Sequence, residues 1–202
     1  MSPATPLLAA RALTLSRGGR ELFRDLSFEV SAGELVQIEG ANGAGKTSLL
    51  RILAGLSRYG YEGTVERADV QLYLGHKSAV KAQLTPRENL ALHVGGEGSH
   101  DDAAIEDALA KVGLYGYEDL PSHTLSAGQH RRVNLARLYL SGSPLWLLDE
   151  PFTAIDRAGV AQLQSLFVDH AGGGGAVMLT SHQPLAVDYP VRALSLEQGK
   201  VA

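Results

Sequence analysis

A glycine-rich run at residues 40–47 has the residue types and spacing of a phosphate-binding loop. It matches the pattern G-x-x-x-x-G-K-[ST] in full and lies between a predicted strand and a predicted helix. Glycines let successive backbone N–H groups point at one anion, and the helix N-terminus adds a favourable dipole. In such a loop Lys46 reaches the β- and γ-phosphates, and the Thr47 hydroxyl ligates Mg²⁺. The candidate nucleotide-binding residues here are Gly40, Ala41, Asn42, Gly43, Ala44, Gly45, Lys46, Thr47 and Ser48.

Two acidic residues follow an apolar run later in the chain. Residues 145–148 predict a buried strand, and Asp149 and Glu150 come directly after it. Ligands bind at the carboxyl ends of the strands in open parallel sheets, so we expect both acids beside the phosphate loop. Asp149 is suited to Mg²⁺ coordination, and Glu150 to a general base that activates water. The pair predicts hydrolysis of a nucleoside triphosphate.

A third motif, Leu-Ser-Ala-Gly-Gln at residues 125–129, begins a predicted helix. Ser126 and Gln129 have the spacing of a capping box, and a capped helix start with small residues also makes an anion site. Together with the first two motifs, this run resembles the signature of ABC-type ATPases. The chain order also fits, because residues 153–156 resemble the D-loop and residues 180–182 the switch-histidine loop.

The resemblance implies Mg-ATP as the bound cofactor and a head-to-tail dimer of two copies that enclose ATP between them. In that family each signature closes on ATP held by the other phosphate loop, so Ser126, Gly128 and Gln129 would contact the partner's nucleotide. Glu150 would polarise the attacking water, and His182 would hold that water and the γ-phosphate. Asp156 would be the D-loop acid. The usual Q-loop glutamine is replaced by His76, which would contact Mg²⁺ through water.

One expected feature of the family is missing. No aromatic residue lies between Leu15 and Glu21, where many ABC ATPases carry the one that stacks on adenine. Arg17 is the candidate replacement, because a guanidinium can also stack on a ring.

The runs at residues 33–40, 125–133, 149–156 and 181–185 are similar to a narrower family, the ATPase subunits of bacterial cytochrome c maturation (haem export) complexes. This similarity implies an integral membrane subunit as partner and a peripheral position on the cytoplasmic face of the bacterial inner membrane. ATP hydrolysis would be tied to release of a haem-loaded chaperone. Three alternatives remain: the ATPase of another small ABC transporter, a soluble ABC ATPase outside transport, and a nucleotide-binding regulator without hydrolysis.

Composition and missing motifs exclude several other classes. The guanine-reading string Asn-Lys-x-Asp is absent, and the loop is not the G-x-G-x-x-G of dinucleotide-binding folds. The chain has no Cys and no histidine pair at metal-ligand spacing. Its net charge of -4 predicts no nucleic-acid partner held by bulk charge. We expect neither a signal peptide at residues 1–10 nor a membrane span, because no apolar run reaches the ~18 residues required.

The elements that position these residues alternate between strands and helices, which predicts an α/β protein with the P-loop ABC ATPase fold. Continuous apolar strands indicate a mainly parallel sheet core. Strands are expected at residues 7–15, 21–30, 34–39, 145–148, 176–180 and 192–196, and helices at 46–53, 85–94, 101–112, 126–140 and 156–170. Residues 63–67 and 70–74 are expected to form a small antiparallel layer. We expect a single ABC nucleotide-binding domain over residues 1–202, with an α/β core from 1–84 and 141–202 and an inserted helical subdomain at 85–140.

Overall fold

The computed structural model describes residues 5–67, 70–92 and 101–196. The chain divides into two compact units. The first unit comprises residues 1–73, 143–151 and 162–202, and the second unit comprises residues 74–142 and 152–161. In the ranges described, no helix has the length and apolar character needed to cross a membrane.

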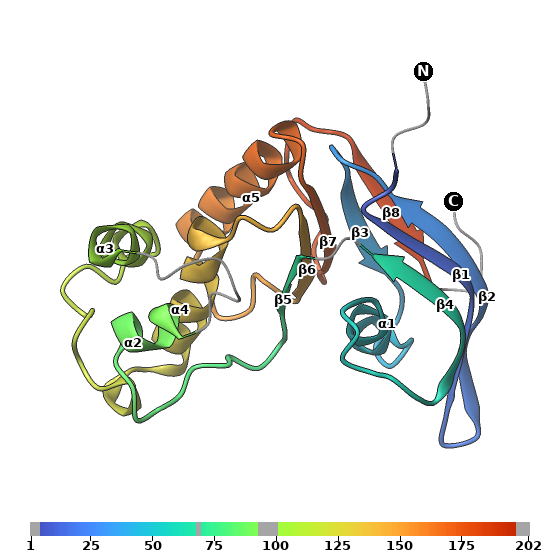
Figure 1. Cartoon of the computed structure of the whole chain (residues 1–202), viewed down its shortest axis with the longest axis horizontal. Helices are drawn as coiled ribbons and strands as arrows, with labels where there is room; N and C mark the ends of the chain where they lie inside the picture. Colours follow the sequence, from blue (N-terminus) through green and yellow to red (C-terminus); the bar gives the residue numbers. More distant parts are fainter. Residues whose placement is uncertain (1–4, 68–69, 93–100, 197–202) are drawn as a thin grey trace. The chain divides into compact units, whose positions relative to one another are not determined.

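The parallel sheet has five strands in the order β5-β6-β7-β3-β8 (Figure 1). The pairs β6–β7, β7–β3 and β3–β8 are parallel, as predicted. Every residue of β6 and β7 is buried, which is why their sequences are apolar throughout rather than alternating. The bounds are β3 Leu35–Glu39, β5 Gln71–Leu74, β6 Leu145–Asp149, β7 Ala176–Thr180 and β8 Val191–Ser195.

A second sheet of the first unit is antiparallel, with the order β2-β1-β4. Its strands are β1 Leu8–Arg17, β2 Arg20–Val30 and β4 Tyr61–Arg67. Gly18 and Gly19, at φ 57° and 74°, form the two-residue turn between β1 and β2. The prediction that residues 70–74 would share this layer was wrong, because β5 joins the parallel sheet. Local alternation shows that a segment is extended, but its pairing partner depends on residues distant in sequence.

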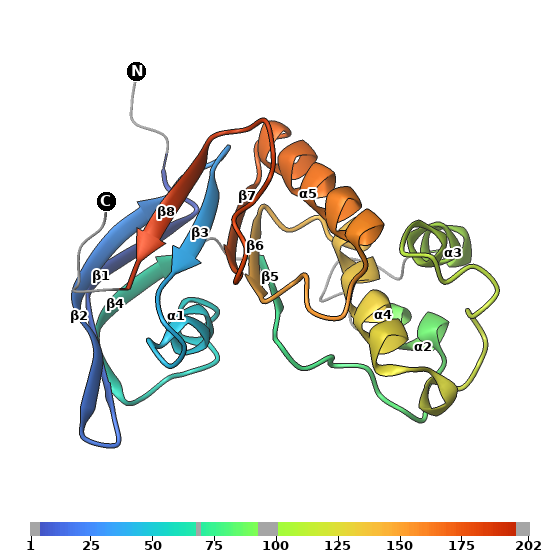
Figure 2. The ribbon, with the colours of Figure 1, turned by 180° about the vertical axis from the view of Figure 1, so that it is seen from behind.

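Helix α1 (Lys46–Leu53) joins both sheets of the first unit into one core (Figures 1 and 2). The opposite face of the parallel sheet packs against the later turns of α5 (Arg157–Gly172), where Trp146 stacks on His170 with ring centroids 3.7 Å apart. Burying each large aliphatic side chain of α1 in this core contributes about 1.5–3 kcal/mol. The buried residues of α1 are Leu49, Leu50, Ile52 and Leu53.

The second unit is helical. It contains α2 (Pro86–Ala91), α3 (Asp102–Lys111) and α4 (Ala127–Leu140), together with the first residues of α5. The predicted helix starts are confirmed, since the side chains of Thr85, Asp101 and Ser126 each accept a first-turn N–H. Val94, the predicted end of the first of these helices, lies outside the described residues.

An ion-pair network holds the helices of the second unit to the loop before α4. Arg87 on α2 lies 2.9 Å from both Glu106 on α3 and Asp119 in that loop. Its hydrogen bond lowers the pKa of Asp119 below the ordinary value for an aspartate. Through Arg87, the loop at residues 113–121 is bound to α2, and the same guanidinium also binds α3.

Candidate functional site

The phosphate loop joins β3 to α1, as the sequence predicts. Gly45, at φ 102°, is the N-cap of α1 and offers no side-chain hydrogen bond to the first turn. A Cβ at this position would lie 3.2 Å from the Cβ of Leu22, so both the backbone angle and the available space favour glycine. The first-turn N–H groups of α1 are donors that a phosphate oxygen could accept.

Lys46 folds back over the loop that precedes it. Its Nζ donates to the Gly40 carbonyl at 2.6 Å and to the Ala41 carbonyl at 3.2 Å. The ammonium group is therefore held by two carbonyls at the start of the loop. A phosphate placed there would be within reach of the same cation after a change of side-chain rotamer.

The buried carboxylate of Asp149 and the hydroxyl of Thr47 lie together at the carboxyl edge of the parallel sheet. The Thr47 Oγ1 donates to Asp149 Oδ1 at 3.1 Å, and Asp149 is 1% exposed. Hydroxyl and carboxylate oxygens are ligands that Mg²⁺ prefers, and Mg²⁺ usually combines one or two such protein ligands with substrate phosphates. In the described part of the chain no group of three acidic or histidine side chains forms a separate metal cluster. The donor set fits Mg²⁺ bound together with a nucleotide.

Thr180, which the sequence reasoning did not select, connects the two acids. It is the last residue of β7 and is directly opposite Asp149 in the sheet register. Its Oγ1 donates to Asp149 Oδ1 at 2.9 Å and accepts the backbone N–H of Glu150 at 2.9 Å. The sequence feature that could have identified Thr180 is its place as the one polar residue at the end of an otherwise apolar strand.

Glu150 and His182 lie close together in the first unit. His182 Nε2 is 3.4 Å from Glu150 Oε1, and the side chains are 63% and 17% exposed respectively. Glu150 has φ 51°, an uncommon angle for a residue with a Cβ, and such conformations concentrate at functional sites. An accessible imidazole beside a mostly buried carboxylate is an arrangement that can orient and deprotonate a water molecule.

A second residue missed by sequence reasoning supports the loop that carries His182. Gln37, 5% exposed on β3, donates from Nε2 to the Gln183 carbonyl at 3.0 Å and accepts the Leu185 N–H at 3.3 Å. The amide thereby binds the backbone on both sides of Pro184. A buried glutamine within an apolar strand was the available signal, because a buried amide requires partners.

The second unit contains the signature residues at the start of α4. The Ser126 Oγ accepts the Gln129 N–H at 3.2 Å, and the Gln129 Oε1 accepts the Ser126 N–H at 2.8 Å. The predicted capping box is confirmed. The Ser126 hydroxyl hydrogen and the Gln129 amide N–H groups are donors suited to phosphate or ribose oxygens. Gly128 lies next to the D-loop, since a Cβ there would be 3.5 Å from the Ala154 carbonyl.

Asp156 caps α5 and pairs with α4. Its Oδ1 accepts the Gly159 N–H at 2.8 Å, and its Oδ2 lies 2.8 Å from the guanidinium of Arg132. The Gly159 N–H, together with the Arg132 charge, lowers the pKa of this carboxyl. Asp156 therefore caps the expected helix, and the same side chain fixes the D-loop to the signature helix.

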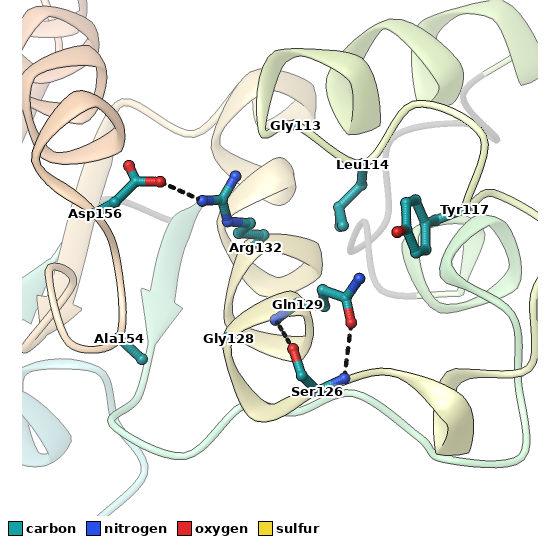
Figure 3. Close-up of a pocket in the computed structure, with 9 residues that line it drawn as sticks. All are labelled: Gly113, Leu114, Tyr117, Ser126, Gly128, Gln129, Arg132, Ala154 and Asp156. Atoms are coloured by element: carbon teal, nitrogen blue, oxygen red, sulfur yellow. Dashed lines mark hydrogen bonds and ion pairs between the residues drawn. The ribbon is translucent and has the colours of Figure 1, made fainter.

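An open pocket of about 480 Å³ adjoins the signature in the second unit (Figure 3). Tyr117, Leu114 and Gln129 lie on one side of it, and Arg132 and Asp156 on the other. The remaining lining residues are Gly113, Ser126, Gly128 and Ala154.

His76 is an exposed residue of the second unit, in the segment that follows β5. This segment is bound to α4, because Arg131 donates to the Gly75 carbonyl at 2.9 Å and Arg137 to the Ala79 carbonyl at 3.2 Å. Burial lowers the pKa of Arg137 to about 10. The backbone around His76 is thus anchored to the helix that carries the signature.

Comparison with known proteins defines first the class and then the family. The ABC transporter family model matches residues 23–153, which include the phosphate loop, the signature and the acidic strand. Relatives from Yersinia pestis (54% identical, 94% of this chain and 93% of the relative), Vibrio cholerae (52%, 91% and 95%) and Hahella chejuensis (50%, 97% and 98%) are each named cytochrome c biogenesis ATP-binding export protein CcmA. The chain therefore belongs to the ABC transporter family and, within it, to the family of these CcmA export proteins.

Solved structures agree with this fold. An ATP-binding cassette described as a dimer in a post-hydrolysis state with ADP and phosphate aligns with a TM-score of 0.82 at 20% identity, over 96% of both chains. An ATP-binding subunit of an ABC transporter aligns with a TM-score of 0.78 at 23% identity, over 95% of this chain and 87% of that one. At these identities the likeness establishes the ABC ATPase fold: a parallel sheet core, a small antiparallel sheet and helices.

Proposed function

We propose that this chain is a single ABC nucleotide-binding domain over residues 1–202 that hydrolyses Mg-ATP as the ATP-binding subunit of a cytochrome c biogenesis complex. Its α/β core would span 1–84 and 141–202, and its helical subdomain 85–140. The observation that carries the proposal is the joint placement of Thr47, Asp149 and Glu150 at one sheet edge, where Thr180 binds both acids.

In the proposed bound state the triphosphate lies across the loop of residues 40–45. The first-turn N–H groups of α1, with Thr47 and Ser48, donate to phosphate oxygens. Lys46 exchanges its carbonyl partners for the β- and γ-phosphates. Thr47 and Asp149 would hold Mg²⁺, which supplies charge neutralisation on the phosphates, and His76 would hold a water in its coordination sphere.

Hydrolysis requires one water to be oriented and deprotonated near the γ-phosphate. In the proposed mechanism Glu150 Oε1 accepts the proton, and His182 donates a hydrogen bond that fixes the water and a γ-phosphate oxygen. The Thr180 hydroxyl keeps the Glu150 backbone in place during this step. General-base assistance of this kind contributes about 10²–10⁴-fold to the rate.

The proposed working unit is a head-to-tail pair of copies bound to an integral membrane subunit. One phosphate loop leaves the γ-phosphate open on one side, and Ser126, Gly128 and Gln129 of the second copy would provide the missing donors. Asp156 would hold the D-loop in this arrangement. The complex would place the chain peripherally on the cytoplasmic face of the bacterial inner membrane, and haem export or release of a haem-loaded chaperone would be the work driven.

Hydrolysis by the chain in its membrane complex tests the enzymatic part. Lys46→Ala and Glu150→Gln are each expected to lower turnover at least about 100-fold. Glu66→Gln, an exposed Glu-to-Gln change on β4, is the matched control and should leave turnover unchanged. Full turnover in either site variant would refute the assigned roles.

Haem staining of c-type cytochromes in cells tests the biological part. In cells whose only copy carries Glu150→Gln, c-type staining should be lost while b-type cytochromes assemble normally. Normal c-type staining would refute the biogenesis role and favour another ABC transporter.

A further inference from the structure

The pocket beside the signature contains an aromatic ring, that of Tyr117, which has no role in the proposed mechanism of hydrolysis. Tyr117 is 36% exposed, and Leu114, which also lines the pocket, is buried. Figure 3 shows the Tyr117 ring next to Gln129 on the side of the pocket away from Asp156. The lining is mostly polar, with Gln129, Arg132 and Asp156 among its residues, so one aromatic ring stands beside several hydrogen-bonding groups. Such a lining suits a ligand that combines a flat ring with polar groups, and 480 Å³ is within the usual size range for ligand sites.

The backbone that carries the ring is held by hydrogen bonds within its own loop. The Tyr117 N–H donates to the Leu114 carbonyl at 3.1 Å, and the Tyr117 carbonyl accepts the Leu120 N–H at 3.3 Å. Arg87 further binds Asp119 two residues later. Because this backbone is ordered before the ligand arrives, only the rotation of the side chain itself is lost on binding, which favours affinity.

The segment before the phosphate loop, over its described residues 5–30, carries no exposed aromatic ring. Within described residues 5–30 the aromatic side chains are Phe23 and Phe28, which are 3% and 6% exposed and packed in the core. The side chain that adjoins the loop at Gly45 is the aliphatic Leu22. Within this segment a purine could therefore meet Leu22 or the guanidinium of Arg17, but no aromatic ring.

We propose that Tyr117 stacks on the purine base of the nucleoside triphosphate held by the phosphate loop of the second copy. This inference rests on the proposed head-to-tail dimer, and it extends the signature contact from the phosphates to the base. Ser126 and Gly128 line the same pocket as Tyr117, so a nucleotide whose γ-phosphate reaches them can place its other end along the pocket toward the ring. Each complete base site then needs residues from both copies.

Binding measurements with and without a base isolate this contact. A non-hydrolysable ATP analogue and inorganic tripolyphosphate are titrated with Mg²⁺ against the full-length chain and its variants. Tyr117→Leu should weaken binding of the analogue about tenfold, because base stacking is lost, and should leave tripolyphosphate binding unchanged. Tyr117→Phe should retain most of the affinity. Tyr115→Leu, at an 83% exposed tyrosine outside the pocket, is the matched control.

Mixing variants tests whether the ring acts on the other copy's nucleotide. When Lys46→Ala and Tyr117→Leu chains are mixed, a mixed pair has one site with an intact loop and an intact ring. A fraction of sites with wild-type affinity should therefore appear. Mixing Tyr117→Leu with the Lys46→Ala/Tyr117→Leu double variant cannot form such a site and serves as the control.

Three results would overturn the inference: equal affinity of Tyr117→Leu and Tyr115→Leu, an equal loss of tripolyphosphate binding, or no tight fraction in the first mixture. Failure of the proposed function gives a different result, because Lys46→Ala alone would then bind the analogue normally. Far-ultraviolet circular dichroism of each variant confirms that the chain is folded.

Discussion

Replacing Thr180 with valine removes one oxygen atom that serves both acids of the candidate site. Valine has nearly the same shape as threonine, and Thr180 is 0% exposed, so packing at the end of β7 is retained. The two hydrogen bonds lost are the donation to Asp149 Oδ1 and the acceptance from the Glu150 N–H, each 2.9 Å long.

The expected cost follows from the kinds of bond lost. A hydrogen bond to a charged acceptor contributes about 1.5–3 kcal/mol, and a neutral one about 0.5–1.5 kcal/mol. Thr47 still donates to Asp149 Oδ1, so we expect about 2–4 kcal/mol in the free energy of unfolding. For a chain of this length that corresponds to a fall in Tm of about 5–15 °C.

Turnover should fall further than stability alone explains. The Glu150 backbone loses its anchor, and displacement of a catalytic group by about 1 Å can cost on the order of 100-fold in rate. The KM for ATP should change little, because the phosphate loop is untouched. Calorimetric melting and steady-state hydrolysis measure the two effects.

Thr180→Ser is the matched control, because it keeps the hydroxyl and removes only a methyl group, at about 1 kcal/mol. Serine should retain most of the turnover. If valine and serine variants have the same Tm and the same turnover, the hydroxyl has no role and the reasoning is refuted.

Three further predictions concern other residues. Gln37→Leu should lower turnover while nucleotide affinity is kept, because it frees the loop that carries His182; equal loss in both quantities in hydrolysis and binding assays would contradict this. The pKa of Asp156 is lowered in the folded state, so its charge should make wild type more stable than Asp156→Asn above pH 3.8. That difference in stability should be lost as the pH falls through the lowered pKa, and melts from pH 2.5 to 6 would measure it. Burial lowers the pKa of His170, so wild type should lose stability as pH falls below 6.5, whereas His170→Phe, which keeps a ring on Trp146, should show a flatter profile between pH 5 and 7.5.

The local features of the site could be predicted because they depend on residues close in the chain. The phosphate loop is a run of eight residues whose glycines set the backbone angles, and its helix follows directly. The capping box of Ser126 and Gln129 lies within four consecutive residues and was confirmed at both hydrogen bonds. Asp149 and Glu150 were predicted to lie at a strand end, because a buried apolar run must stop where charged groups reach the sheet edge.

Contacts between segments far apart in the chain could not be predicted from the sequence. Residues 71–74 had the pattern of a strand but gave no sign of which sheet they would join, because pairing is decided by partners about 70 residues away. Thr180 meets Asp149 only through the register of β6 and β7. Gln37 reaches the His182 loop across 146 positions of sequence.

The sequence by itself determined the chemistry available to this protein: a phosphate loop, two acids at a strand end, a capped signature helix and the family they resemble. Each of these depends on backbone angles and hydrogen bonds within a few residues. Only the tertiary structure decided which side chains hold these residues in place, namely the Thr180 hydroxyl and the Gln37 amide. A buried polar group takes its role from partners that folding brings to it, and a linear pattern does not contain their distances.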